Sequence, residues 1–272
     1  VRSWRLYERL AAKDRFTPRD VLDVHYDTTN PARREIVRLG LHLRDVLKGE
    51  LSPQAAAALK YLEPWYRRGA KSDLTEPGAE TAASLNTFFR FVATPLAGRH
   101  GGGESGLARF LTDVDKRIAK NAKAPLDETE VEFIDQALTA AWGASQSKYR
   151  NSDPAGWPAR ARKEVLARRM GWFESLDGFA SLDRAGDLTY PGLTCVDGGT
   201  IKSQGAQSYT QYVPMHDVDS AMSILPPGHS DRAGDPQRTS TVKLWSAGKL
   251  HPAPLSRKAV DRLAVSTPVL AT

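Results

Sequence analysis

The stretch SYTQYVPMHDVDSAMSILPPGHSDRAGDPQRTSTVKLWSAGKLHPAPL, residues 208–255, has the most distinctive pattern in the chain. It contains two short β-type segments, a Pro-Pro-Gly turn, a polar loop and a closing segment that includes Trp245. Short apolar and β-branched runs between turn residues are typical of strands. The stretch therefore predicts a strand pair followed by a loop, and it contains no self-contained catalytic constellation.

The chain from Leu188 onward consists of similar short runs separated by turn residues. We expect strands within residues 188–199, 200–204, 208–215, 221–228 and 240–245. So few short strands do not easily make a closed sheet with a covered core. We therefore expect them to join strands that another segment of polypeptide supplies.

The residues before these strands have the apolar periodicity of helices. A first helix is expected from about Trp4 to Lys13 and Asp14. Thr17, Asn30 and Ser52 each precede a proline, which predicts a capping residue and a proline in the first turn of three further helices. More helices are expected at about residues 81–94, 106–121, 127–143 and 158–170.

Two segments between these helices lack periodicity. The tract GRHGGGESG, residues 98–106, is expected to be a flexible connector, because it lacks the Gly-Lys-Ser/Thr ending of a phosphate-binding loop. The stretch YRNSDPAGWP, residues 149–158, is expected to be a loop. Asp127 caps the helix between them, and Glu130 completes a capping box.

Helices followed by strands predict an α+β protein. We expect a mainly helical region at residues 1–180 and a β-rich segment at 181–272. Val1 to Leu10 already has helical periodicity without a cap before it. We therefore expect the chain to be a piece of a longer precursor, with trimming of a tagged protein as the alternative.

The composition is that of a globular protein with a net charge of +6. The densest basic run, on the helix expected at 158–170, favours a solvated face, and no aromatic residues interleave with it as base stacking requires; its members are Arg160, Arg162, Lys163, Arg168 and Arg169. We expect no nucleic-acid partner. No run approaches the ~18 apolar residues of a membrane span, and the charged first residues are unlike a signal peptide.

The residue types that perform chemistry are scattered. Cys195 is the only cysteine, which excludes an intrachain disulfide, and its apolar strand context predicts a buried side chain. The six histidines form no HExxH motif, and we expect no metal site in this chain. His216, Asp217 and Asp219 favour a hairpin turn over a ligand cluster, because strand alternation would place His216 on the opposite face from the two aspartates. His229-Ser230-Asp231 cannot be a catalytic triad, because adjacent side chains diverge.

Other residues occur in an informative order. Arg2 begins the first helix, Thr17 caps the next, and an Asp27-x-Thr29-x-x-Ala32 pattern follows. ALKYLEP then leads to Trp65. Near the other end, VDGGTIKSQGAQS precedes the strand pair, and the chain continues with a W-x-x-G-x-x-x-P pattern at residues 245–252.

In order and spacing, these motifs resemble the C-terminal part of the large β chain in the penicillin amidase family. This family of N-terminal-nucleophile hydrolases includes penicillin acylases and acyl-homoserine-lactone acylases. The chain departs from the family pattern at several positions, so loop structure and substrate are not carried over. The departing residues are Tyr66-Arg67, Ile201-Lys202, Ala206, Thr210, His229, Asp231 and Ser240-Thr241.

The resemblance implies that the chain is the C-terminal part of an αββα sandwich made by autoprocessing of a precursor. It implies a Ser nucleophile at the β-chain N-terminus, whose own α-amine acts as the base through a water. The oxyanion hole, and calcium ligands of the whole enzyme, would lie upstream of this segment. Val1 cannot supply that nucleophile.

Arg2 is the one position that the resemblance carries to the active site. It would match an Arg that lines the site and orders the oxyanion Asn, a role that suits a permanently charged guanidinium. Without the resemblance, Arg2 has the context of an exposed helix charge.

Two hypotheses for function follow. The first is an acylase subunit that cleaves the linear amide of an acylated amine, such as a β-lactam or an acyl-homoserine lactone. It would work with N-terminal chains of the same precursor, in the periplasm or outside the cell. The alternative is a non-catalytic α+β interaction protein whose basic face binds an anionic partner.

Overall fold

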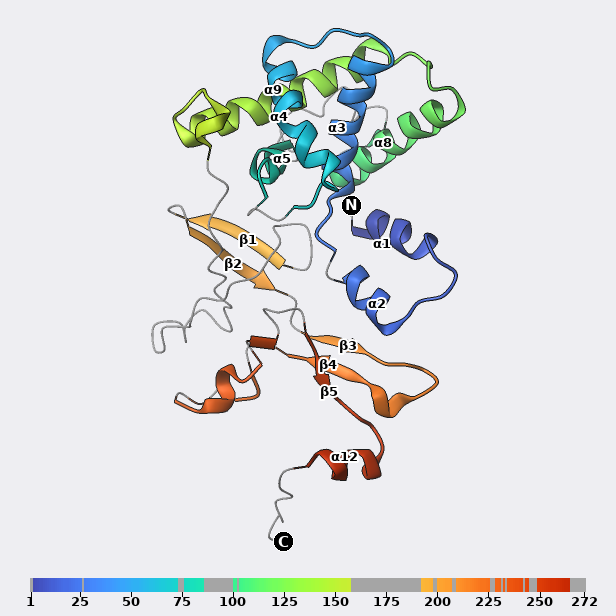
Figure 1. The fold of residues 1–272 in the computed structure, drawn as a ribbon, viewed down its shortest axis with the longest axis vertical. Helices are drawn as coiled ribbons and strands as arrows, with labels where there is room; N and C mark the ends of the chain where they lie inside the picture. Colours follow the sequence, from blue (N-terminus) through green and yellow to red (C-terminus); the bar gives the residue numbers. More distant parts are fainter. Residues whose placement is uncertain are drawn as a thin grey trace. The chain divides into compact units, whose positions relative to one another are not determined.

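The computed structural model describes residues 2–25, 27–72, 76–85, 100–101, 103–157, 192–197, 200–206, 209–225, 228–230, 232, 234–241, 243–244 and 249–264 (Figure 1). For residues 2, 103–105, 192–197, 200–206 and 238–239 it describes the backbone alone. The described residues form two compact units, which we treat separately. The first contains residues 2–14 and 27–157, and the second contains residues 15–25 and 192–264.

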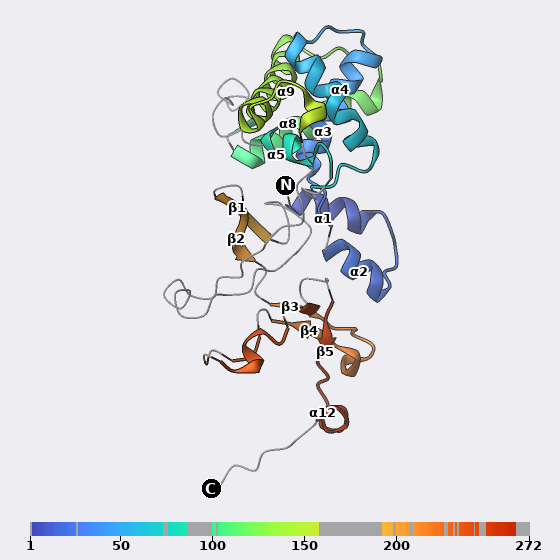
Figure 2. The same ribbon diagram turned by 60° about the vertical axis from the view of Figure 1, so that its left-hand side comes forward.

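The first unit is a helical bundle built around α3 (Pro31–Asp45). Ten of the 15 residues of α3 are buried. It packs against α4 (Pro53–Arg67), α8 (Gly103–Lys120) and α9 (Glu128–Tyr149), as Figures 1 and 2 show. The short α5 (Ala79–Leu85) lies against α9. α3 is therefore the helix around which the unit's core forms.

The core of this unit comes from apolar positions spaced three or four residues apart on these helices. Its largest fully buried apolar side chains are Ile36, Leu39, Leu59, Leu62, Trp65, Leu85, Phe110, Leu111, Ile134 and Leu138. Trp65 also donates its indole N–H to the Lys71 carbonyl at 2.7 Å. That bond ties the chain after α4 back to the helix.

The expected caps of the bundle are confirmed. Asn30 accepts backbone hydrogen bonds from Ala32 and Arg33 at the start of α3. Ser52 accepts one from Ala55 at the start of α4. Asp127 and Glu130 form the reciprocal capping box of α9. These caps succeed as predictions because a cap is fixed by neighbours within one turn.

The second unit contains α2 (Pro18–His25) and two antiparallel sheets. Strands β1 (Gly192–Asp197) and β2 (Thr200–Ala206) pair with each other. Strand β4 (Met222–Ile224) lies between β3 (Thr210–Tyr212) and β5 (His251–Pro252). Buried Ile224 and Leu250 pack with partly buried Leu22, Tyr212, Met222 and Leu244. α12 (Arg257–Leu263) follows the second sheet.

The α+β class is confirmed, because helices dominate the first part and antiparallel strands the second. Thr17 caps α2 as expected: its hydroxyl accepts the Asp20 backbone N–H at 3.2 Å, and Asp20 accepts the Thr17 backbone N–H at 3.0 Å. His216 lies in a turn between β3 and β4, as its sequence context indicated. The division at residue 180 stays a prediction.

Three expectations about element bounds were wrong. Residues 103–106 are not a connector but the first turn of α8, because Gly106 lets the carbonyl of Gly101 approach the helix where a Cβ would otherwise lie. α9 continues past Gly143 to Tyr149, since Ser145 bonds Thr81 of α5 at 2.8 Å. The loop expected at 149–158 accordingly starts one residue later and contains η1 (Pro154–Gly156).

The prediction of a strand at 240–245 is also wrong for those of its residues that the structure describes. Thr241 lies in a turn after η3 (Pro236–Thr239), and Lys243 and Leu244 are helical. The Thr241 hydroxyl donates to the Leu225 carbonyl at 2.8 Å, a long-range bond that local propensity does not reveal. The remainder of the helix expected at 81–94, the basic helix at 158–170 and the Cys195 side chain lie outside the described residues.

None of the helices in the described part of the chain is long and apolar enough to cross a membrane.

Close helix packing at Gly40 gives a stability prediction. A Cβ at this position of α3 would lie 3.1 Å from Leu59 Cδ1 and 3.2 Å from Leu138 Cδ1. We expect Gly40→Val to lower the free energy of unfolding by about 1–3 kcal/mol through overpacking. Urea unfolding measures the change.

Gly143→Ala is the matched control, because nothing lies within 4 Å of a Cβ at Gly143 in α9. This substitution should raise stability by about 0.5–1 kcal/mol through helix propensity. Equal effects of the two substitutions would contradict the packing at Gly40.

Candidate functional site

The candidate site residue, Arg2, is the first residue of α1 (Arg2–Ala11). The structure thus places its backbone at the N-terminal end of a short helix, and its side chain lies outside the described part. Whether Arg2 reaches an active site stays a prediction. What the structure does describe is how α1 itself is held.

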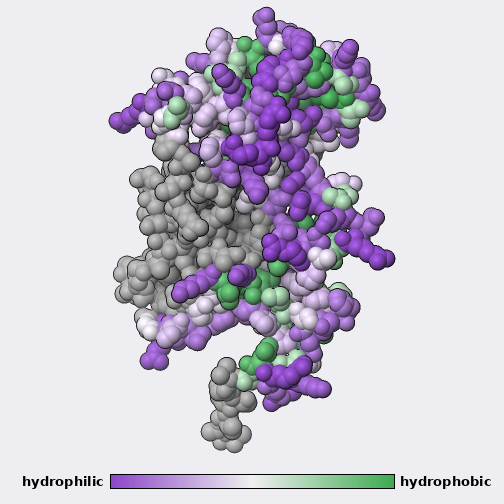
Figure 3. All heavy atoms as spheres, in the orientation of Figure 1, coloured by the Kyte–Doolittle hydropathy of each residue, from purple (hydrophilic) through white to green (hydrophobic). Residues whose placement is uncertain are grey.

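Helix α1 has no buried side chain among residues 3–11. Tyr7 is 74% exposed and Leu10 is 53% exposed. The surface over α1 in the view of Figure 3 is largely hydrophilic. Trp4 and Leu6 are half-buried, and the described contacts that join α1 to the rest of its unit come from its charged groups.

Two arginines of α1 contact one carboxylate that lies outside the helix. Arg5 Nη2 donates to Asp27 Oδ2 at 2.6 Å, and Arg9 Nε lies 3.4 Å from the same oxygen. The Asp27 side chain is only 10% exposed. Ion pairs shielded in this way are screened less by salt than exposed pairs.

Glu8 forms a second attachment, to helix α3. Arg34 Nη2 donates to Glu8 Oε1 at 2.7 Å, and Arg34 Nη1 donates to Glu8 Oε2 at 3.1 Å. Arg5 Nη1 donates to Glu8 Oε2 at 2.8 Å. Two parallel bonds between a guanidinium and a carboxylate fix direction as well as distance. Arg5 and Glu8 thus link α1 both to the turn before α3 and to α3 itself.

The ion pairs continue along α3 to α8. Glu35 pairs with Arg34 at 3.0 Å and with Arg38, and Arg38 Nη2 donates to Asp115 Oδ1 at 2.6 Å. We call the whole set the α1 charge network. Its members are Arg5, Glu8, Arg9, Asp27, Arg34, Glu35, Arg38 and Asp115.

Asp27 also shapes the turn that leads into α3. Its Oδ1 accepts the Thr29 backbone N–H at 2.7 Å. Thr29 in turn forms an isolated antiparallel β-bridge with Lys71. The Ser72 backbone N–H donates to the Thr28 carbonyl at 3.0 Å. The two oxygens of Asp27 therefore have separate partners: Oδ2 holds α1, and Oδ1 holds the turn.

The network shifts the pKa of three of its members, Asp27, Glu8 and Arg34. Burial alone would raise the pKa of Asp27, but donation from Arg5 and from the Thr29 N–H brings that pKa below its usual range. Burial opposes Arg34 and Arg5 in the same way at Glu8, whose pKa is also lowered. Burial alone would lower the pKa of Arg34, but Glu8 and Glu35 raise it. All these groups stay charged near neutral pH.

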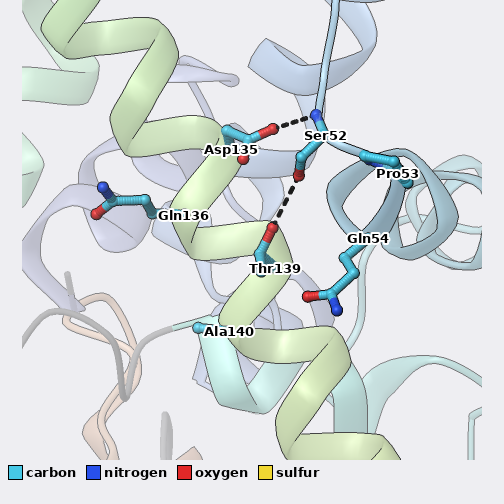
Figure 4. A pocket seen from close by; sticks show the side chains of 7 residues that line it. All are labelled: Ser52, Pro53, Gln54, Asp135, Gln136, Thr139 and Ala140. Atoms are coloured by element: carbon cyan, nitrogen blue, oxygen red, sulfur yellow. Dashed lines mark hydrogen bonds between the residues drawn. The ribbon is translucent and has the colours of Figure 1, made fainter.

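A surface hollow of about 660 Å³ lies elsewhere on the bundle, where α4 starts beside α9 (Figure 4). Three of its polar residues, Ser52, Asp135 and Thr139, bond one another. The Ser52 backbone N–H donates to Asp135 Oδ2 at 2.6 Å, and the Ser52 and Thr139 hydroxyls lie 3.2 Å apart. These bonds join the two helices, and the hollow gathers no nucleophile with a base.

The described residues contain no group of three or more His, Cys, Asp or Glu side chains that could hold a metal ion. His229 lies at a bend and meets His251 edge to face, with 5.8 Å between ring centroids. This arrangement agrees with a turn at His229. The structure does not describe Asp231, and the dense basic run at 160–169 lies outside the described residues as well.

The sequence singled out Arg2, Asp27, Thr29 and Ala32, but it missed the ion pairs that join Asp27 to α1. Ala32 is buried at the start of α3, and Asp27 and Thr29 form the turn before it. The spacing of Arg5 and Glu8, three residues apart on one helix, was a usable signal. The contact between Arg5 and Asp27 spans 22 residues and follows no spacing rule.

Comparison with known proteins places this chain beside one family model and beside solved structures. A family model described as penicillin amidase matches residues 1–262. Among solved structures, thermostable penicillin G acylase from Alcaligenes faecalis is similar, with a TM-score of 0.55 and 15% sequence identity. The match covers 100% of this chain and 52% of the acylase chain, so this chain spans about half of that chain's length. A search of curated proteins finds no match.

The α1 charge network predicts a pH-dependent stability. We expect Glu8→Gln to lower the free energy of unfolding at pH 7 by about 1–2 kcal/mol, because a charge-assisted contact is lost in a partly screened setting. The pKa of Glu8 is lowered by folding, so its stabilisation is present above the unfolded value, about 4.3, and is lost as pH falls through the folded value.

Urea unfolding of both proteins from pH 7 to pH 3 measures this. The difference between them should be constant near neutral pH and shrink below about pH 4. Asp261→Asn, in the exposed Arg257–Asp261 pair, is the control and should cost less than about 0.5 kcal/mol. A Glu8→Gln effect that does not change with pH would contradict an ionic role.

Proposed function

We propose, because this chain belongs to the penicillin amidase family, that it is the C-terminal part of an acylase β chain. The enzyme would hydrolyse the linear amide bond of an acylated amine. The observation that carries the proposal is the family match over residues 1–262. The similar fold of a penicillin G acylase over the whole chain supports it.

The nucleophile of this enzyme would lie on another segment of polypeptide. This chain spans about half of the similar acylase chain, 52%, which leaves room for the remaining active-site groups elsewhere. An N-terminal Ser released by autoprocessing of a zymogen would attack the amide carbonyl, with its own α-amine as base through a water. The partner would then be N-terminal chains of the same precursor, in a heteromer with an αββα sandwich.

Arg2 is the residue that we assign to the active site. Its guanidinium would order the side chain that stabilises the oxyanion, because several fixed N–H donors on a permanent charge hold a neighbouring amide in one orientation. Its backbone lies at the first residue of α1, so the position of α1 sets the position of Arg2. Arg2 would act on the transition state through the oxyanion donor.

Calcium in the assembled enzyme would be held by residues outside the described part of this chain, in which no three or more His, Cys, Asp or Glu side chains gather to hold a metal ion. We assign it no step in the reaction. The acyl group and the amine, as in a β-lactam or an acyl-homoserine lactone, would be selected mainly by other segments. A periplasmic or secreted location is part of the same proposal.

Native purification tests the proposed function. All N-termini of the purified protein would be sequenced, and the protein would be assayed for release of free amine from N-acyl amides. We expect a co-purifying chain that starts with Ser, Thr or Cys, together with amide hydrolysis. A folded, monodisperse chain without a partner and without hydrolysis would overturn the proposal.

Substitution of Arg2 gives a second test. Arg2→Ala should lower kcat/KM of the assembled enzyme by about 10- to 100-fold, somewhat less than removal of an oxyanion donor itself. Its Tm should change little. Arg19→Ala is the control, because Arg19 is an exposed helical arginine paired with Asp23. If both variants keep full activity, Arg2 has no role in the site.

A further inference from the structure

We propose that Asp27 is a positioning residue, which fixes α1 and thereby Arg2 through ion pairs rather than through an apolar core. This inference rests on the proposed function. It assigns to Asp27 an effect on turnover, exerted through Arg2, and no contact with substrate.

In the described part of the chain, α1 is attached through its charged side chains more than through buried apolar ones. None of its described side chains at residues 3–11 is buried, and its most exposed large apolar residue, Tyr7, is 74% exposed. The neighbouring helix α3, in contrast, is buried over most of its length. α3 would stay in place if the ion pairs were lost, whereas α1 would not.

Asp27 contacts two arginines of α1 at once. Its Oδ2 contacts Arg5 at 2.6 Å and Arg9 at 3.4 Å, which are one helical turn apart on α1. One carboxylate therefore holds two successive turns and fixes the direction of the helix axis. Glu8 adds the contact to Arg34 of α3 at 2.7 Å, so α1 is tied to the bundle from two sides.

Arg2 lies on the same helix as these contacts, but at some distance from them along the axis. At a rise of 1.5 Å per residue, position 2 lies about 4.5 Å along the axis from Arg5 and about 10 Å from Arg9. A tilt of the helix at these contacts therefore moves position 2 by an ångström or more. Displacements of about 1 Å can cost about a hundredfold in rate.

Asp27→Asn separates the two roles of this residue. The Asn side chain keeps an Oδ1 that accepts the Thr29 N–H, and it loses the charge that holds Arg5 and Arg9. Glu63→Gln is the matched control. Glu63 lies in α4, a helix that does not carry Arg2. Its side chain is 20% exposed and accepts a hydrogen bond from Arg44 at 2.9 Å.

The experiment uses the complete assembled enzyme and two measurements. Steady-state kinetics on an N-acyl amide should show kcat about 10- to 100-fold lower in Asp27→Asn, with KM within about twofold of wild type. Amide hydrogen exchange in residues 3–11 should be at least about tenfold faster in Asp27→Asn and unchanged in Glu63→Gln. Exchange in α9 should be the same in all three proteins.

A double substitution tests whether Asp27 acts through Arg2. In an Arg2→Ala background, Asp27→Asn should cause no further loss of kcat, because the group that it positions is already absent. An equal loss in both backgrounds would overturn the proposal, as would unchanged kcat or unchanged exchange in Asp27→Asn. A wild-type enzyme without amide hydrolysis would overturn the proposed function instead. The amide hydrogen exchange of α1 would then still decide whether Asp27 holds this helix.

Discussion

The carboxylate of Asp27 lies where three parts of the helical unit meet. Its Oδ2 accepts from Arg5 of α1 at 2.6 Å, and its Oδ1 accepts the Thr29 N–H at 2.7 Å, beside the strand-like contact of Thr29 with Lys71. A single carboxylate can do this because its two oxygens accept independently. The geometry of α1 relative to α3 depends on this residue remaining charged.

Two kinds of force thus organise the first unit. Apolar burial around α3 assembles the bundle, and this contribution is insensitive to pH and only weakly sensitive to salt. The α1 charge network then adds a peripheral helix whose attachment weakens with acid and with salt. If Arg2 belongs to an acylase site, catalysis depends on the α1 charge network, although folding of the unit depends mainly on apolar burial.

Local features of the fold could be predicted from the sequence, and long-range ones could not. Asn30-Pro31 and the Asp127–Glu130 capping box fix helix starts within one turn, so they were found. The start of α8 depends on how Gly101 approaches Gly106, and the turn at Thr241 depends on Leu225. The partners of Asp27 were missed for the same reason, since Arg5 lies 22 residues away.

Under the proposed function, this chain supports amide hydrolysis while the nucleophile belongs to another segment. Intact-mass spectrometry of the natively purified protein after reaction with a serine-directed sulfonyl fluoride tests it most directly. We expect one covalent adduct at the N-terminal residue of a co-purifying chain, with loss of hydrolysis and no adduct on this chain. An inactivating adduct on residues 1–272, or hydrolysis by this chain alone, would contradict it.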